Sequence, residues 1–198
     1  WMCPGGRVIG SSAAGGGVIT NGMSDYRRDG SYANSAVVVN IRAEDLDSND
    51  PLAGLAFRRQ WEERAYHAGG GTYGAPAQRL TDFLAGQKVS PLGRCSFLPG
   101  VREADLTILL PPFVVEALKR GFVEFERKMP GFVTSEATLI GVETRTSSPV
   151  RIVRGESGQS VTTPGLFPCG EGAGYAGGIV SSALDGVRAA ERLITAGG

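Results

Sequence analysis

The glycine-rich segment 165–179 runs directly into an amphipathic pattern over 180–194. It constrains the possible fold and function of this chain more than any other feature. It predicts a short buried strand up to Cys169, a turn that carries the carboxylate of Glu171, and the start of a helix. Glycine lets a backbone approach a ligand closely, and a helix start offers unpaired N–H groups and a positive dipole end. This combination indicates a site for a nucleotide cofactor.

The spacing of Gly172, Gly174 and Gly177 also fits the dinucleotide fingerprint G-x-G-x-x-G. That fingerprint requires a complete βαβ unit with an acidic residue at the end of the next strand. Here the chain ends at Gly198, inside or just after the predicted helix. We therefore reject the fingerprint, which as a lone match is only weakly specific.

Charge and composition narrow the possible functions. Twenty basic and twenty acidic residues cancel, which argues against nucleic acid or an anionic membrane as partner, because both need a basic excess. No apolar run approaches the roughly 20 residues that span a bilayer. Three separated cysteines and one histidine, His67, predict no metal site, no disulfide framework and no Ser-His-Asp hydrolase. The expected compartment is the reducing cytoplasm.

Local patterns predict an α+β fold, with a mixed or antiparallel sheet, packed helices and a C-terminal strand-turn-helix. The expected strands are 7–12, 17–21, 36–42 and 138–154, with a glycine-rich hairpin turn between the first two and a break at 147–149. The expected helices are 52–67, 76–84 and 112–129, before the final helix. The apolar face of the final helix, which should pack on a sheet, is formed by Val180, Leu184, Val187, Ala190 and Ile194.

The glycine-rich segment belongs to a longer pattern that includes residues 2–6, 20–24, 33–36 and 143–151. This pattern resembles the uncharacterised bacterial FAD-dependent dehydrogenases, which are flavoproteins of the two-dinucleotide-binding-domain type. In such proteins a Gly-Asp or Gly-Glu pair at a strand end holds a ribityl hydroxyl of FAD, and the following helix points its N-terminus at the flavin. The resemblance implies an oxidoreductase that transfers hydride between a small-molecule substrate and FAD.

The resemblance also implies a domain organisation. In that family the pyrophosphate-binding Rossmann fingerprint lies near the N-terminus of a much longer polypeptide, and this chain starts at Trp1 without it. We therefore expect the C-terminal portion of an enzyme, whose partner is the missing Rossmann domain of the same polypeptide. Residues 1–145 would be mostly a substrate or cap domain, and residues 146–198 the FAD-binding segment. Alone, the chain should bind FAD weakly or not at all and be inactive.

Glu171 is the first candidate for a cofactor contact, since its carboxylate can accept hydrogen bonds from sugar hydroxyls. The alternative is an acid at a helix start, favoured by the helix dipole. Backbone groups that approach the flavin would come from Gly170, Gly172, Gly177, Gly178 and Ile179. Their alternative is a plain tight turn.

Two groups of residues are candidates for binding substrate. Arg145 and Arg151 flank the segment 146–149, which the resemblance places beside the flavin, and a guanidinium can hold a substrate carboxylate in a bidentate manner. Either arginine could equally be a surface charge. A polar patch that could shape a substrate pocket contains Asn21, Met23 and Ser24, although turn chemistry also explains Asn-Gly. No catalytic acid or base is identified.

An alternative function stays open, namely a non-catalytic ligand-binding or interaction domain in which the glycine turn holds a phosphate or merely packs. The carboxylate of Glu171 bears on this choice, because it would repel a phosphate but suits a sugar hydroxyl. The charge therefore favours the flavin hypothesis.

Overall fold

The computed structural model describes residues 2–11, 15–86 and 89–196, and the chain forms two compact units. Unit 1 contains Trp1–Arg42 and Phe57–Thr144, and unit 2 contains Ala43–Ala56 and Arg145–Gly198. Each unit is described by itself below. Helices and small sheets occur together, so the prediction of an α+β fold is confirmed.

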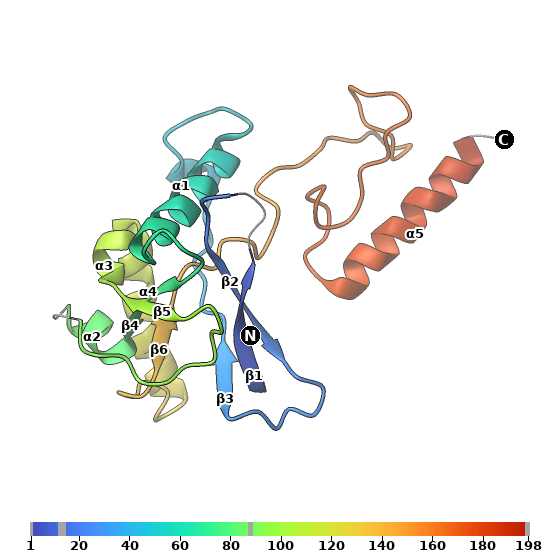
Figure 1. The fold of residues 1–198 in the computed structure, drawn as a ribbon. Helices are drawn as coiled ribbons and strands as arrows, with labels where there is room; N and C mark the ends of the chain where they lie inside the picture. Colours follow the sequence, from blue (N-terminus) through green and yellow to red (C-terminus); the bar gives the residue numbers. More distant parts are fainter. Residues whose placement is uncertain (1, 12–14, 87–88, 197–198) are drawn as a thin grey trace. The chain divides into compact units, whose positions relative to one another are not determined.

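The first sheet of unit 1 is antiparallel and has the strand order β2-β1-β3 (Figure 1). Its strands are β1 (Met2–Ser11), β2 (Ile19–Ser24) and β3 (Tyr32–Ser35). The predicted hairpin of the first two strands is confirmed, with Arg7 opposite Met23 and Ile9 opposite Asn21. Residue 12, the predicted end of the first strand, lies outside the described residues.

The second sheet of unit 1 is mixed, with the strand order β5-β4-β6. Its central strand β4 (Ala75–Arg79) runs parallel to β5 (Val101–Glu103) and antiparallel to β6 (Thr138–Ile140). Ala75 and Ala77 are fully buried in β4. Small side chains at these positions allow helices and loops to cover the sheet closely.

Three long helices agree with the predicted ones: α1 (Ala53–Ala68), α4 (Pro112–Lys128) and α5 (Ile179–Ala196). Unit 1 also contains two short helices, α2 (Leu80–Ala85) and α3 (Leu106–Leu109). The 3-10 turn η1 (Ala43–Asp45) belongs to unit 2. The main apolar core of unit 1 lies between α2, α3 and α4. It is built on Leu80, Phe83, Leu106, Val115 and Phe122.

Two predicted elements of unit 1 are wrong. The segment 36–42 is irregular rather than a strand, because the strand that pairs with β1 lies just before it, in β3. A β-branched run forms a strand only where a ladder partner is present. Residues 76–79 belong to β4 rather than to a helix, and only Leu80–Ala85 is helical. Pairing on both sides of β4 overrides the weak strand preference of alanine and proline.

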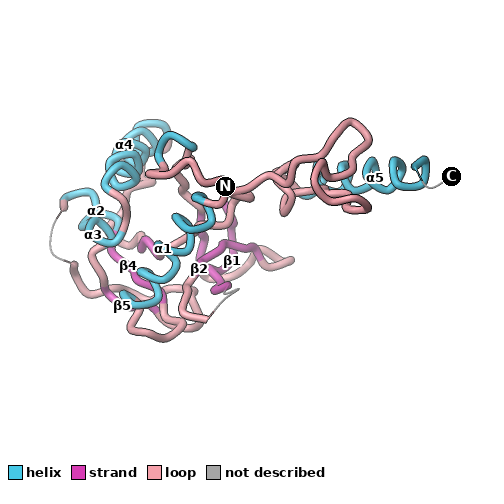
Figure 2. Tube along the Cα trace, turned by 90° about the horizontal axis from the view of Figure 1, so that it is seen from above, coloured by secondary structure: helices cyan, strands magenta, loops and turns pink. Residues whose placement is uncertain are grey.

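Two further predicted strands are mostly absent. Of 138–154 only Thr138–Ile140 forms a strand, and Arg154 makes an isolated bridge with Ser160. The residues before Gly170 are also irregular, and Cys169 is exposed rather than part of a strand core. Figure 2 shows the long stretch between β6 and α5 as loop. In unit 2 this stretch is held by side chains and by scattered backbone hydrogen bonds instead of a continuous strand ladder.

A search of the helices in the described parts of the chain finds none with the length and apolar character that crossing a bilayer requires.

Candidate functional site

The glycine-rich segment forms a tight turn over residues 170–175 in unit 2. The N–H of Gly174 donates to the carbonyl of Glu171 at 2.9 Å, and the N–H of Tyr175 donates to the carbonyl of Gly170 at 3.1 Å. Gly170 and Gly174 have φ angles of +71° and +82°, a region that other residues rarely adopt. A Cβ on Gly174 would also lie 2.5 Å from the carbonyl oxygen of Val150. The turn therefore requires glycine at position 174 for its conformation and for space.

Glu171 is half-buried on this turn. Among the residues that the structure describes, no hydrogen bond or ion pair engages its carboxylate. Helix α5 begins at Ile179, eight residues after Glu171, and its first turn contains no acid. The alternative that Glu171 is an acid of the helix start is therefore wrong, and its carboxylate is available to another group.

The remaining predicted cofactor residues lie on the surface, from within the turn to the first residue of α5. Gly172, Gly177, Gly178 and Ile179 are exposed, and Ile179 has 90% of its surface accessible. Ser181 caps the helix start, since its Oγ accepts from the N–H of Gly178 at 3.1 Å and donates to the carbonyl of Gly178 at 3.0 Å. The backbone of this segment can be reached by a ligand.

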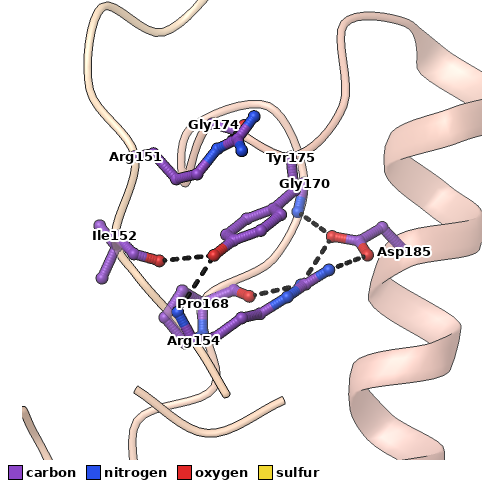
Figure 3. A network of polar contacts seen from close by, with 8 residues as sticks. All are labelled: Arg151, Ile152, Arg154, Pro168, Gly170, Gly174, Tyr175 and Asp185. Carbon is purple, nitrogen blue, oxygen red and sulfur yellow. Dashed lines mark hydrogen bonds and ion pairs between the residues drawn. The ribbon is translucent and has the colours of Figure 1, made fainter. Parts of the chain in front are cut away.

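A buried polar network supports the turn from below (Figure 3). Arg154 and Asp185 form a bidentate ion pair, with N···O distances of 2.7 and 3.0 Å. Asp185 Oδ2 also accepts from the N–H of Gly170 at 2.8 Å, and Arg154 Nη1 donates to the carbonyl of Pro168 at 2.7 Å. The hydrogen bonds from Arg154 and from Gly170 lower the pKa of Asp185 to about 2. The pair is therefore charged at neutral pH.

Tyr175 closes the other end of the turn. Its hydroxyl accepts from the N–H of Arg154 and donates to the carbonyl of Ile152, both at 3.1 Å. The guanidinium carbon of Arg154 lies 3.7 Å from the ring centroid, and that of Arg151 lies 5.1 Å away. Figure 3 shows the ring between the two arginine side chains. The ring of Tyr175 therefore makes cation–π contacts, and its hydroxyl both accepts and donates a hydrogen bond.

The predicted substrate residues are divided between the two units. Arg151 lies at the turn, where its Nε donates to the carbonyl of Gly174 at 3.1 Å. Arg145 lies at the start of the same segment and is half-buried. Asn21, Met23 and Ser24 lie on β2 of unit 1, where alternation puts Asn21 and Met23 on one exposed face. The hydroxyl of Ser24 donates to the carbonyl of Pro4 at 3.2 Å, which gives it a structural contact within the sheet.

Sequence reasoning missed Arg154, Asp185 and Tyr175. The two charged residues are 31 positions apart, and neither stands in a recognisable motif. Tyr175 offered a signal, because a single large aromatic residue inside a glycine run must pack against something. Within the described residues no cluster of three histidine, cysteine, aspartate or glutamate side chains could hold a metal ion.

Comparison with known proteins defines the class of this chain as a flavoprotein-associated α+β domain. Residues 1–146 match the family described as FAD-dependent protein, C-terminal domain-like, and the chain belongs to that family. It is also similar to an uncharacterised protein of Clostridium beijerinckii, with 45% identity over 195 residues. That alignment covers 98% of this chain, so the similarity extends through unit 2, but this chain spans only 37% of the relative's length.

Proposed function

We propose that this chain is the C-terminal part of an FAD-dependent oxidoreductase that transfers hydride between a small-molecule substrate and the flavin. Residues 146–198 close the flavin site, and residues 1–145 form a substrate or cap domain. The observation that carries this proposal is the carboxylate of Glu171, which has no partner among the described residues, on a glycine turn that a polar network holds in place.

The turn suits the sugar part of the cofactor. A carboxylate accepts hydrogen bonds from hydroxyls and repels phosphate, so Glu171 fits the ribityl chain better than the pyrophosphate. The half-buried backbone of Gly170 and the exposed backbone of Gly172, Gly177, Gly178 and Ile179 would lie close to the flavin ring. FAD, when bound, supplies the hydride chemistry, while the protein orients it and keeps water away.

Arg151 is the best-supported candidate for holding a substrate carboxylate. Its Nε is used by Gly174 and its guanidinium lies near the ring of Tyr175, which together fix its direction. In the described part of the chain it forms no ion pair, in contrast to Arg154. Its two terminal nitrogens can therefore make the bidentate contact that carboxylates prefer. Arg145, Asn21, Met23 and Ser24 are secondary candidates.

The apolar face of α5 supports a partner domain. Val180, Leu184, Val187 and Ile194 are 71%, 52%, 56% and 76% exposed, although they form one continuous apolar stripe. A stripe of this kind normally packs against another element. More than half of the Clostridium beijerinckii relative lies outside the aligned region. We assign the stripe to packing against the Rossmann domain of the longer protein.

The first test compares visible absorption spectra of two proteins. One is the protein expressed from its complete native reading frame, called the longer protein here, and the other is the 198-residue chain. We expect a flavin spectrum in the longer protein and none in the short chain. A colourless longer protein that takes up no added FAD would overturn the proposal and favour a non-catalytic binding domain. Tight, stoichiometric FAD binding by the short chain would show that the cofactor site is misplaced.

The second test addresses Glu171 in the longer protein. Glu171→Ala should weaken FAD binding by about tenfold or more, since a hydrogen bond to a charged group contributes about 1.5–3 kcal/mol. Glu171→Gln keeps an acceptor and should lose less. The matched control is Glu156→Gln, an exposed acid of the same unit. Equal FAD occupancy in all three variants would remove Glu171 from the site.

A further inference from the structure

We propose that Arg154 and Asp185 form a clamp that fixes the turn 170–175 in the conformation that receives FAD. Both are positioning residues, since they act through the turn and not by touching the cofactor. The inference rests on the proposed function, and it adds residues that no sequence motif identifies.

The clamp holds the beginning of the turn through two neighbouring backbone groups. Asp185 Oδ2 accepts from the N–H of Gly170 at 2.8 Å, and Arg154 Nη1 donates to the carbonyl of Pro168 at 2.7 Å. These groups lie on either side of Cys169, whose side chain is exposed. Because Arg154 also binds both oxygens of Asp185, the two anchor points are linked to each other.

The clamp holds the end of the turn through Tyr175. The guanidinium of Arg154 stacks on the ring, and the backbone N–H of Arg154 donates to the hydroxyl at 3.1 Å. Arg154 thus contacts residues on both sides of Glu171, as Figure 3 illustrates for the residues of the network. Since the carboxylate of Glu171 has no partner of its own among the described residues, its position depends on the backbone of the turn.

The network holds both ends of the turn, while its middle is held by the N–H of Ile152, which donates to the carbonyl of Ala173, and by the hydroxyl of Ser148, which donates to the carbonyl of Gly172, both at 3.2 Å. The side chains of Arg154 and Asp185 are only 13% and 14% exposed. In the described residues of unit 2, the buried apolar side chains are limited to the small ones of Pro168, Ala173 and Ala189. Apolar packing is therefore too sparse to fix the loop. A loop held in its bound conformation loses less conformational entropy when the ligand arrives, which increases affinity.

Asp185 lies outside the apolar stripe of α5, about 100° around the helix from Leu184. Asp185 and Val187 are two residues apart, which corresponds to about 200° around a helix. A change at Asp185 can therefore alter the turn while leaving the stripe of Val180, Leu184, Val187 and Ile194 intact. This separation allows the clamp to be tested independently of domain packing.

The experiment measures the FAD dissociation constant of the longer protein by quenching of flavin fluorescence, with melting temperatures in parallel. Asp185→Ala and Arg154→Gln should each raise the dissociation constant by about 10- to 100-fold, because each removes hydrogen bonds to a charged group. The matched control is Glu191→Gln, which removes an exposed charge from the same helix and should change the constant less than about twofold.

A charge swap separates positioning from simple stabilisation. Arg154→Asp combined with Asp185→Arg keeps two opposite charges but removes the acceptor for the N–H of Gly170 and the guanidinium on Tyr175. If the pair acts as a clamp, the FAD dissociation constant of this double variant stays above that of the parent, while its melting temperature returns toward that of the parent. Recovery of both quantities together would mean that the pair only stabilises unit 2, and it would overturn the clamp.

A milder variant covers the case in which the swap does not fold. Asp185→Asn keeps an oxygen acceptor at the same place, so its dissociation constant should lie between those of the parent and Asp185→Ala. Equal affinity for FAD in the parent, Asp185→Asn and Asp185→Ala would also overturn the clamp. If the parent itself takes up no FAD, the proposed function fails instead, so the two failures are distinguishable.

Discussion

In unit 1 the side chains of Leu80, Phe83 and Phe122 have at most 2% of their surface exposed, whereas the buried apolar side chains in the described residues of unit 2 are the small ones of Pro168, Ala173 and Ala189. Unit 1 places large apolar side chains inside and forms two sheets around them. Unit 2 has one long helix whose large apolar side chains are mostly exposed.

This difference shows that the folds of the two units are stabilised in different ways. Burial of large aromatic and aliphatic side chains gives unit 1 most of its stability, since this term grows with the apolar area removed from water. Unit 2 depends on the ion pair of Arg154 and Asp185, on Tyr175 and on hydrogen bonds to loop carbonyls. A part of the chain with so little apolar core is marginal by itself and gains stability from a covering surface. Unit 1 and unit 2 should therefore respond differently to the same kinds of substitution.

The largest effect is expected from the core of unit 1. Phe122 is 2% exposed and its ring lies 6.3 Å from that of Phe83 and 6.4 Å from that of Phe132, measured between centroids. Phe122→Ala should lower the free energy of unfolding by about 4 kcal/mol, because it leaves a cavity between packed rings. Urea unfolding of the 198-residue chain measures this. Val123→Ala, at a position 61% exposed on the same helix, is the control and should change it by less than about 0.5 kcal/mol.

The next effect concerns the apolar stripe of α5. Val187→Asp should leave the 198-residue chain within about 0.5 kcal/mol of the parent, because the side chain is 56% exposed there. In the longer protein the same change should cost about 3 kcal/mol, since it would bury a carboxylate at a domain interface. Thermal unfolding of both proteins provides the comparison. An equal effect in the two proteins would show that nothing covers this face.

A smaller effect is expected from the hydroxyl of Tyr175. Tyr175→Phe removes the acceptor for the N–H of Arg154 and the donor to Ile152, at a cost of about 1–2 kcal/mol. Hydrogen exchange should become faster at the amide of Arg154 and stay unchanged in unit 1. Tyr26→Phe serves as control, because that side chain is fully exposed. Faster exchange throughout unit 1 would contradict the separate stabilisation of the two units.

The smallest effect is expected from the titration of Asp185, which leaves the stability unchanged near neutral pH and acts only in acid. Its pKa is lowered from the ordinary 3.8 to about 2, so the folded state favours the charged carboxylate. Its stabilising contribution is complete well above pH 4 and is lost as the pH falls through about 2. Carbon-13 NMR of the Asp185 carboxyl group should show a midpoint near pH 2, and Asp185→Asn identifies that signal by its loss. A midpoint near pH 4 would mean that the clamp is not formed in solution.

Local patterns in the sequence indicated several elements correctly. The hairpin of β1 and β2 and the helices α1, α4 and α5 follow from short-range periodicity and turn residues, which act between neighbours along the chain. The same reasoning failed for β4, where Pro76 and two alanines gave no strand signal and pairing with two distant segments decided the conformation. It failed again before Gly170, where a carbonyl–arginine contact replaces a strand ladder.

By itself the sequence determined the glycine turn, the carboxylate at position 171 and the amphipathic helix that follows, because each depends on residues a few positions apart. Only the tertiary structure decided that Arg154 pairs with Asp185, that Tyr175 closes the turn and that no acid in the described parts of the chain pairs with Arg151. The reason is physical: ion pairs, stacked rings and ladder partners form between segments far apart in the chain. Their energies depend on distances that a linear pattern does not contain.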